Sequence, residues 1–426
     1  MGHPRERRLL QELDRREFLA AAISGFPVAA ALLAACDRGA SQDPVLSSAP
    51  AVPGSPTALP LFEGLAPIAD DLAPERNARL RVYGWGPSYF SPQLLRVFEE
   101  KYGCIIDFIP FRTMEDAIQR LRTGAFEADV FVPTIKVIGT LAAARQLRPL
   151  NYSYIPHLAS NVWHTLLSPF YDTGPRYSVP YFVWTTGTSW RHDLVAKDPR
   201  EYDSPYDIFW DPVQRGHVHV LNSVQDLVGM GLLQIGVDAN TEDPEEIAHA
   251  RNALLDMVDA VQPQLDSSDY HDLFTGAAHV HQSWSGNLAF AKHYAPTPSD
   301  LAKLSYWWPP SGNSGKPGLK GNDVLVVMAN ARNPVLAHHF LDFFLEDENS
   351  YANSVYNGYQ APVHSVNGDH LVAAGAVSEN LRSIIVTQED FALGTQELEL
   401  SPDADALFHS TYDDVEHAAK AATLAG

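Results

Sequence analysis

The stretch Arg79–Phe111, RLRVYGWGPSYFSPQLLRVFEEKYGCIIDFIPF, carries the local signals for a strand, a helix and a second strand. The apolar run Leu80–Trp85 predicts the first strand. Ser91-Pro92 predicts the start of a helix, because serine caps helices and proline fits the first helical position. Gly103 predicts the end of that helix, and Cys104–Ile109 predicts the second strand.

The segment that follows repeats the same alternation. Thr113 opens a predicted helix that runs to Leu121, Asp129–Val132 predicts a third strand, and Ile135–Arg145 predicts a third helix. Alternating strands and helices predict a parallel βαβαβ sheet in an α/β fold. Ligands bind such sheets in the crevice beyond the carboxyl ends of the strands. We therefore expect binding residues just after each of these strands.

The second half of the chain shows the same style less regularly. We predict strands at 217–221, 280–284 and 324–328, and helices at 227–235, at 244–261 and from Asn333-Pro334 onward. The segments 181–188 and 320–324 are predicted to cross between two lobes, with a further return after residue 359.

The beginning of the chain predicts an export signal. Phe18–Ala35 is uncharged and apolar, follows Arg15-Arg16, and ends at Cys36. The paired arginines resemble a twin-arginine signal, and Leu33-Ala34-Ala35-Cys36 resembles a bacterial lipobox. The resemblance implies export, cleavage before Cys36, and a lipid on Cys36 that tethers the protein outside the cytoplasmic membrane. The alternative is a transmembrane anchor.

Composition limits the partners and the organisation of the remaining chain. The chain of 426 residues has a net charge of −22, which disfavours nucleic acid as a partner. It contains two cysteines, so with Cys36 assigned to lipid, Cys104 is predicted to be a buried, inert thiol. Residues 36–78 are rich in Pro, Ala and Ser and predict a flexible tether. Residues 79–426 are long enough for two lobes with cores of their own.

Six short motifs in a fixed order carry a family resemblance. They are Tyr83-Gly84-Trp85, Ala128–Thr134, Tyr177–Tyr181, Ser283–Asn287, Asn322-Asp323, and Gly358-Tyr359 before Ala361-Pro362. In this order and spacing they resemble the spermidine/putrescine-binding proteins of bacterial ABC importers. That family is a branch of the two-lobed periplasmic binding proteins, so the resemblance implies a type II-like α/β fold with a cleft between the lobes. Lobe 1 would contain 79–186 and 322–363, and lobe 2 would contain 187–321 and 364–426.

The resemblance also implies a set of ligand-binding residues in the cleft. Aromatic walls would come from Trp85, Trp284 and Tyr359, carboxylates from Asp323 and Asp226, and a further polar contact from Thr134. This set suits a polyamine, because its methylene groups bury against rings while each ammonium gains a cation–π attraction of about 0.5–2 kcal/mol. A desolvated ammonium also needs a carboxylate, because an unpaired buried charge is costly.

Three positions depart from the family pattern. Lys136 stands where an aromatic residue is expected, Ser223 where an acid is expected, and Gly321 where another tryptophan is expected. These changes remove aromatic area and one negative charge, and they add a positive charge. The ligand is therefore either a shorter amine or an amino-acid-derived or phosphonate zwitterion whose anionic group pairs with Lys136.

Catalytic and metal-binding functions find less support in the sequence. It contains no nucleophile elbow, no HExxH motif and no Cys–His set. His217 with His219, and His279 with His281, each place two imidazoles on one strand face, but no third ligand has a matching spacing. We expect neither a metal nor a cofactor. An exported enzyme and a structural envelope protein remain the alternatives from other classes.

The sequence thus predicts a monomeric, lipid-anchored receptor without enzymatic activity. It would bind a small cationic amine such as putrescine or spermidine by closure of its lobes. It would then deliver that amine to an ABC permease in the membrane.

Overall fold

The computed structural model describes residues 52–425, apart from 54, 57, 87, 125–126, 175, 205, 267–269 and 310–316. All of these residues belong to one compact unit. The predicted export signal and Cys36 lie outside the described residues. Across the part of the chain that is described, no helix combines the length and the apolar character needed to span a membrane.

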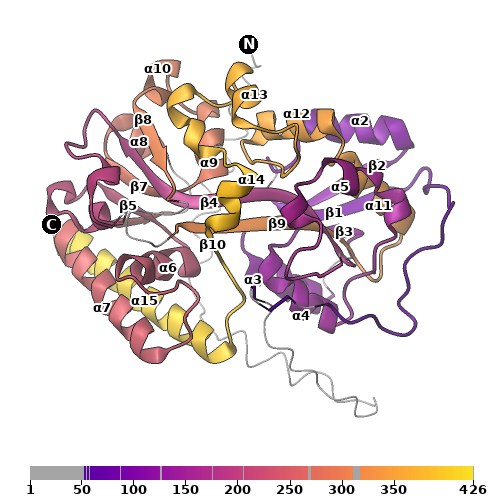
Figure 1. Cartoon of the computed structure of the whole chain (residues 1–426), viewed down its shortest axis with the longest axis horizontal. Helices are drawn as coiled ribbons and strands as arrows, with labels where there is room; N and C mark the ends of the chain where they lie inside the picture. Colours follow the sequence, from indigo (N-terminus) through magenta and orange to yellow (C-terminus); the bar gives the residue numbers. More distant parts are fainter. Residues whose placement is uncertain are drawn as a thin grey trace. The chain divides into compact units, whose positions relative to one another are not determined.

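A single mixed sheet organises the described residues, with strand order β2-β1-β3-β9-β4-β7-β5-β6 (Figure 1). The strands are β1 (Arg79–Trp85), β2 (Ile105–Phe111), β3 (Val130–Phe131), β4 (Ser178–Arg191), β5 (Val218–Leu221), β6 (Gln264–Asp266), β7 (Val280–Trp284), β8 (Leu304–Trp307), β9 (Leu319–Val327) and β10 (Thr395–Gln396). β8 pairs with β4, and β10 pairs with β9. β1 is parallel to both β2 and β3, as the alternation in the sequence predicts.

Two long central strands connect the halves of the sheet. β4 and β9 are antiparallel and stay paired from Ser178 opposite Val326 to Thr186 opposite Leu319. On one side lie β1–β3, which we call the lobe 1 side. On the other side lie β5–β7, which we call the lobe 2 side. The crossing segments predicted from the sequence fall within β4 and β9.

Each side of the sheet carries its own helices (Figure 1). The helices are α2 (Pro92–Tyr102), α3 (Met114–Arg122), α4 (Ile138–Ala143), α5 (Pro156–Asn161), α6 (Val224–Gln234), α7 (Pro244–Val261), α8 (His271–Thr275), α9 (Ser285–Phe290), α10 (Pro298–Leu301), α11 (Pro334–Phe343), α12 (Asp347–Asn357), α13 (Gly368–Ala373), α14 (Gln388–Leu393) and α15 (Pro402–Ala425). α2 and α3 pack near β2, whereas α6, α7 and α15 pack on one another at the lobe 2 side.

Local signals in the sequence explain where the first helices begin and end. α2 starts at Pro92 and ends at Gly103, whose φ of 63° suits a residue without a side chain. At α3, the Thr113 side chain accepts a hydrogen bond from the Asp116 backbone N–H at 3.2 Å. The third predicted helix is shorter than expected, because a 3₁₀ turn at Ile135–Val137 precedes α4.

The segment before β1 contradicts the tether prediction. Residues 58–78 are held by hydrogen bonds to the folded body: the Tyr177 hydroxyl donates to the Pro60 carbonyl at 2.6 Å. The Glu75 carboxylate accepts from the Leu336 N–H at 2.7 Å and so caps α11 from outside that helix. The prediction was wrong for 58–78 because this segment is fixed by partners distant in sequence, which composition does not reveal.

Candidate ligand-binding site

Asp323 and Thr134 meet at the edge of the central strands. Asp323 lies on β9, and Thr134 follows β3 and forms an isolated antiparallel bridge with it. Both side chains are buried. Thr134 Oγ1 has no hydrogen-bond partner among the described residues, whereas the Asp323 carboxylate interacts with Tyr89 and with the Trp184 side chain. Both side chains offer acceptor oxygens, and an ammonium is a group that only donates.

The Asp323 carboxylate has one strong partner inside the protein. The Tyr89 hydroxyl donates to Asp323 Oδ2. Burial raises the pKa of Asp323 to about 7, although the Tyr89 hydrogen bond, the Lys136 charge and the Trp184 side chain all lower it. Asp323 therefore changes charge near neutral pH, and an additional cation beside it would favour the charged form.

Tyr89 is a binding-site candidate that the sequence analysis did not assign. Its ring packs against those of Phe182 and Tyr359, with centroid distances of 5.1 and 5.6 Å. The Tyr359 hydroxyl in turn donates to Asn287 Oδ1 at 2.7 Å. Tyr89 follows β1, which is where the parallel-sheet argument places binding residues. That position was the available signal, and Tyr359 is brought to the same place as expected.

On the lobe 2 side, Asp226 is held by three side-chain donors. The hydroxyls of Thr186 and Ser223 each donate to its carboxylate at 2.6 Å. The Trp284 indole N–H donates to Asp226 Oδ2 at 3.2 Å. Asp226 lies in the first turn of α6 and is 3% exposed. The structure therefore joins the predicted residues Asp226 and Trp284. It also gives Ser223 the task of orienting the acid.

Trp184 explains the glycine at position 321. The two residues are opposite each other on β4 and β9. A Cβ atom on Gly321 would lie 2.1 Å from the Trp184 ring, so only glycine leaves room for the indole. The family pattern predicts that Gly321 reduces the aromatic area of the site. The structure corrects this, because a tryptophan from the neighbouring strand covers that position.

Trp85 is placed differently from the other aromatic candidates. It lies at the end of β1, is half-buried, and packs against Phe111 with a centroid distance of 4.6 Å. Its indole nitrogen is buried without a hydrogen-bond partner among the described residues. The contacts described for Trp85 join it to the apolar core and not to the acids.

Lys136 reaches from the lobe 1 side to residues of the opposite side. Its ammonium donates to Glu397 Oε2 at 2.8 Å and to Gln225 Oε1 on α6. The Glu397 side chain is 4% exposed. Burial disfavours the charge on Lys136, but the Glu397 carboxylate outweighs it and raises the pKa of Lys136. The lysine is therefore already paired within the protein, and its role as a ligand contact stays a prediction.

The buried charges of the site do not balance. Three carboxylates, those of Asp226, Asp323 and Glu397, act electrostatically on the single ammonium of Lys136 or accept from it. Burial raises the pKa of Glu397 to about 7, with Lys136 opposing that rise. A cation entering here would favour the charged forms of Asp323 and Glu397, whereas an anion would favour their neutral forms.

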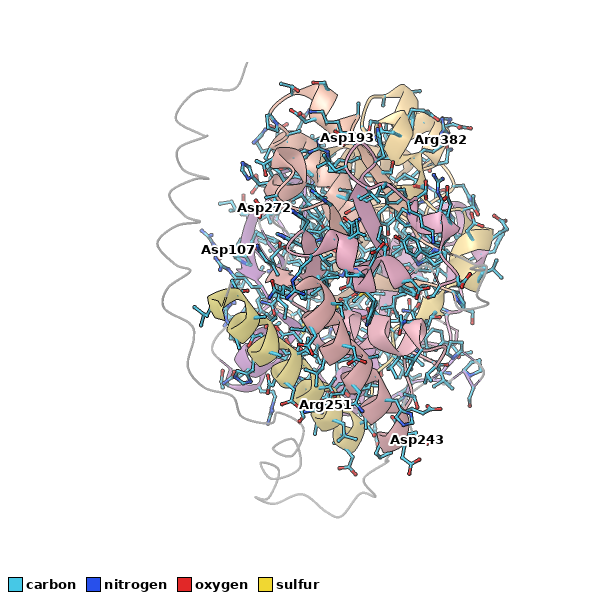
Figure 2. The ribbon with its side chains drawn as sticks, turned by 90° about the vertical axis from the view of Figure 1, so that its left-hand side faces the viewer. Asp107, Asp193, Asp243, Arg251, Asp272 and Arg382 are labelled. Atoms are coloured by element: carbon cyan, nitrogen blue, oxygen red, sulfur yellow. The ribbon has the colours of Figure 1, made fainter. Side chains whose placement is uncertain are left out.

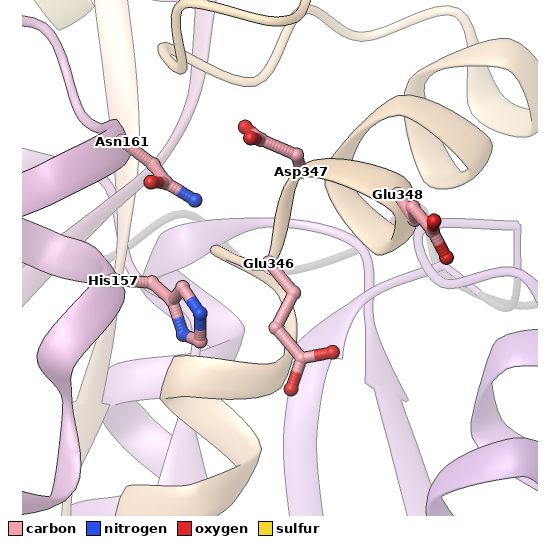
Figure 3. Close-up of a pocket in the computed structure, with 5 residues that line it drawn as sticks. All are labelled: His157, Asn161, Glu346, Asp347 and Glu348. Atoms are coloured by element: carbon pink, nitrogen blue, oxygen red, sulfur yellow. The ribbon is translucent and has the colours of Figure 1, made fainter.

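Cavities show where open space remains. The cavity lined by Lys136, Glu397 and Tyr171 has a volume of about 30 Å³, close to that of one water molecule. A larger hollow of about 410 Å³ is lined by His157, Asn161 and the acidic run Glu346–Glu348 (Figure 3). The smaller cavity, beside Lys136 and Glu397, thus has room for a water molecule but not for an amine.

Comparisons with known proteins identify relatives of this chain. Its putrescine/cadaverine-binding relative in Pseudomonas aeruginosa is 27% identical over 279 residues, which are 64% of this chain and 76% of that protein. The spermidine/putrescine-binding periplasmic protein of Escherichia coli is 26% identical over 289 residues, covering 67% and 78%.

Solved structures show the same fold. The spermidine/putrescine transporter substrate-binding protein of Streptococcus pneumoniae superposes with a TM-score of 0.65 at 20% identity, covering 80% of this chain and 99% of that one. A lipoprotein of Treponema pallidum gives a TM-score of 0.66 at 21% identity, with the same coverage. The fold is thus the two-lobed α/β fold that the sequence predicts.

A family model described as bacterial extracellular solute-binding protein matches residues 93–376, which is more than half of the chain. The chain belongs to the bacterial extracellular solute-binding protein family.

Proposed function

We propose that this protein is an extracytoplasmic receptor for a small cationic amine, which it delivers to an ABC permease. The observation that carries the proposal is the excess of buried carboxylates, Asp226, Asp323 and Glu397 against Lys136, between the two sides of the sheet. The names of its relatives, which include putrescine and spermidine binders, point to the same ligand class. The receptor would be a binding protein and not an exported enzyme.

The cleft offers different chemistry to the two parts of such a ligand. Asp323 Oδ1 and Thr134 Oγ1 are acceptors for an ammonium group. The rings of Tyr89, Tyr359 and Trp284 provide apolar faces for the methylene chain and cation–π attraction for its charged ends. A carboxylate for each ammonium matters most, because an unpaired charge in a buried site costs several kcal/mol.

Lys136 limits how many ammonium groups the ligand carries. Its own ammonium pairs with the Glu397 carboxylate. Glu397 is therefore not available to the third ammonium group of a longer polyamine. The remaining acids, Asp226 and Asp323, match the two charges of a diamine. We therefore propose putrescine or a diamine of similar length as the preferred ligand, with spermidine second. The zwitterion alternative is weakened, because a carboxylate ligand would have to separate Lys136 from Glu397.

Titration calorimetry with matched four-carbon ligands tests the proposal. Putrescine has two ammonium groups, γ-aminobutyrate has one ammonium and one carboxylate, and 1,4-butanediol has no charge. We expect putrescine to bind at least tenfold more tightly than spermidine, and butanediol not to bind. Tighter binding of γ-aminobutyrate than of putrescine would replace the amine with the zwitterion. A correctly folded protein that binds none of the amines would contradict the proposal.

Lobe closure and membrane attachment complete the proposed function. A ligand that touches both sides stabilises the closed form, which a permease then recognises. We propose that the protein acts as a monomer, exported with a twin-arginine-like signal and anchored through Cys36. A Cys36→Ser variant should appear in the soluble extracytoplasmic fraction, whereas the unaltered protein should stay with the membrane. Equal partition of the two proteins would contradict the lipid anchor.

A further inference from the structure

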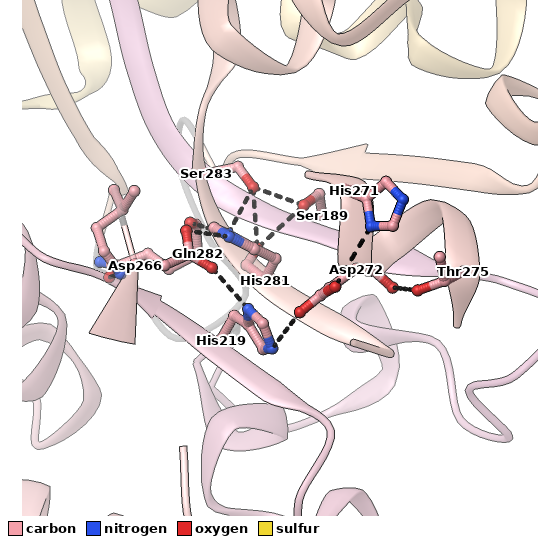
Figure 4. Close-up of polar contacts among 10 residues, drawn as sticks. Ser189, His219, Asp266, His271, Asp272, Thr275, His281, Gln282 and Ser283 are labelled. Carbon is pink, nitrogen blue, oxygen red and sulfur yellow. Dashed lines mark hydrogen bonds and ion pairs between the residues drawn. The ribbon is translucent and has the colours of Figure 1, made fainter. Parts of the chain in front are cut away.

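A second polar cluster lies on the lobe 2 side of the sheet. His219 is on β5, His281 on β7 and Asp266 on β6, and β5 lies between the other two strands. Asp266 Oδ2 is 2.7 Å from His219 Nδ1, and Asp266 Oδ1 is 3.2 Å from His281 Nε2 (Figure 4). His219 is 1% exposed and His281 is fully buried. Three side chains of metal-ligating type therefore converge on one point.

The hydrogen bonds of His281 leave its second nitrogen facing an acceptor. His281 Nδ1 lies 2.5 Å from the Gln282 carbonyl oxygen, which can only accept, so Nδ1 carries the hydrogen. In the neutral ring Nε2 then has a lone pair and no hydrogen. That lone pair faces the Asp266 carboxylate, another acceptor, so the contact requires either a second proton on the ring or a metal ion between the two atoms.

His219 Nε2 also faces an acceptor and not a donor. If Nδ1–H donates to Asp266, Nε2 is left as a lone pair, and it has no hydrogen-bond partner among the described residues. The nearest charged atom given for it is Asp272 Oδ2 at 3.8 Å, again an acceptor. A metal ion on Nδ1 would reverse this arrangement, because the hydrogen would move to Nε2 and point toward Asp272.

We propose that His219 Nδ1, His281 Nε2 and the Asp266 carboxylate bind one Zn²⁺ ion. Two imidazoles and a carboxylate, with a water as fourth ligand, are an ordinary tetrahedral zinc set. Ligands at about 2.1 Å from a tetrahedral ion lie about 3.4 Å apart, so the 3.2 Å and 2.7 Å contacts widen by under about 1 Å. Asp272 and the Gln282 carbonyl serve as outer partners that orient the two rings.

The ion has a path from solvent and a place in the architecture. The Asp266 and Asp272 side chains are 22% and 35% exposed, although both histidines are buried, and Asp272 is at the surface in Figure 2. β7 continues from His281 to Trp284, and the chain continues from β5 to Asp226. The ion would therefore fix the strands that lead to two candidate ligand-binding residues.

Metal analysis of the untagged protein tests this proposal. We expect one Zn²⁺ per chain after dialysis against ZnCl₂. Zn²⁺ should raise the unfolding midpoint of EDTA-treated protein by on the order of 3 °C. Co²⁺ in its place should give the visible absorption of a tetrahedral site. His281→Gln and His219→Gln should each abolish the zinc-dependent shift, and circular dichroism checks that these variants fold.

A matched pair of histidines provides the control. His217 and His279 stack on each other with a centroid distance of 3.9 Å, and their ring nitrogens are hydrogen-bonded to Ala277 and Gln214. His217→Gln and His279→Gln should keep the zinc-dependent shift. Loss of the shift in these variants instead would overturn the proposal. So would a wild-type protein that binds no zinc, because the contacts with Asp266 would then be made by protons. If His219→Gln and His281→Gln do not fold, the wild-type Co²⁺ spectrum decides alone.

Discussion

The two acids that we assign to the ligand, Asp323 and Asp226, have opposite surroundings. Asp226 receives three hydrogen bonds from side chains on β4, on β7 and just before α6. Asp323 interacts with Tyr89 and Trp184, but burial outweighs these contacts and raises its pKa to about 7. Asp226 thus has three donors before a ligand arrives, whereas the buried charge of Asp323 is compensated less fully and would gain from a ligand ammonium. Binding energy should therefore depend more on Asp323, and the stability of the unliganded protein more on Asp226.

Replacing Asp323 should have the largest effect. We expect Asp323→Asn to weaken putrescine binding by about 100-fold, because a charge-assisted hydrogen bond in a buried site contributes about 1.5–3 kcal/mol. Calorimetry measures the loss. Asp226→Asn should weaken binding less, but it should lower the unfolding midpoint of the unliganded protein. The new amide NH₂ group would face the donors of Thr186, Ser223 and Trp284 and could not accept their hydrogen bonds. The midpoint of Asp323→Asn should rise instead.

The surface acid Asp107, on β2, is the control for both changes. Its side chain is 45% exposed and it is labelled in Figure 2. Asp107→Asn removes the same charge and should alter neither affinity nor midpoint measurably. Equal losses of affinity in Asp323→Asn and Asp226→Asn would remove the distinction drawn between the two acids.

Lys136 pairs with Glu397 and so leaves fewer carboxylates for the ligand. Lys136→Met should therefore change which amine is preferred. The variant frees Glu397 for a third ammonium, and we expect the affinity for spermidine relative to putrescine to rise by roughly 30-fold. Competition titration with both amines measures this ratio. Lys101→Met is the control, because Lys101 pairs with Glu346 outside the site. An unchanged ratio would show that Lys136 does not occupy an amine position.

The pH dependence of stability and of binding should report on Asp323. Asp323 has a folded pKa raised above its unfolded value of 3.8, so the folded state holds its proton longer. Its contribution to stability is therefore full below pH 4 and is lost as pH rises toward 7. Amine affinity should instead increase with pH, roughly tenfold from pH 6 to pH 7.5, because the ligand needs the ionised carboxylate. Calorimetry across that range should find a flatter profile in Asp323→Asn.

The hydroxyl groups around each acid should give the smallest effects. Tyr89→Phe removes one internal donor of Asp323, and we expect roughly fivefold weaker binding at pH 7, consistent with the loss of about 1 kcal/mol. Ser223→Ala removes one of three donors from Asp226 and should change affinity less than twofold. A larger loss in Ser223→Ala than in Tyr89→Phe would reverse the ranking of the two acids. Both are measured by the same titration.

The sequence predicts the parts of the fold whose signals are local. The α2 boundaries follow from Ser91, Pro92 and Gly103, and α7 has the predicted bounds. Asp226, Trp284, Asp323 and Tyr359 were placed by family resemblance, and the structure brings them to the centre of the sheet. Their roles as ligand contacts stay predictions.

What the sequence did not predict depends on contacts between distant segments. Glu397 lies 261 positions from Lys136, and nothing near either residue indicates their pairing. Asp266 was missed as a partner of the histidines because its strand, β6, has only three residues. Trp184 and Gly321 are complementary only once β4 and β9 are paired. Such complementarity is a property of strand register and lobe arrangement, which no local pattern encodes.

The Glu75 cap on α11 has a consequence for how the molecule comes apart. Glu75 and Leu336 are 261 positions apart, yet one carboxylate supplies the acceptor that the first turn of α11 lacks. α11 packs on β9, the strand that carries Asp323. Detachment of the segment before β1 would therefore remove the cap of α11. It would weaken the packing of α11 on β9, the strand that carries Asp323. Proteolytic trimming in this segment should release bound amine faster, although the cut lies far outside every residue that touches it.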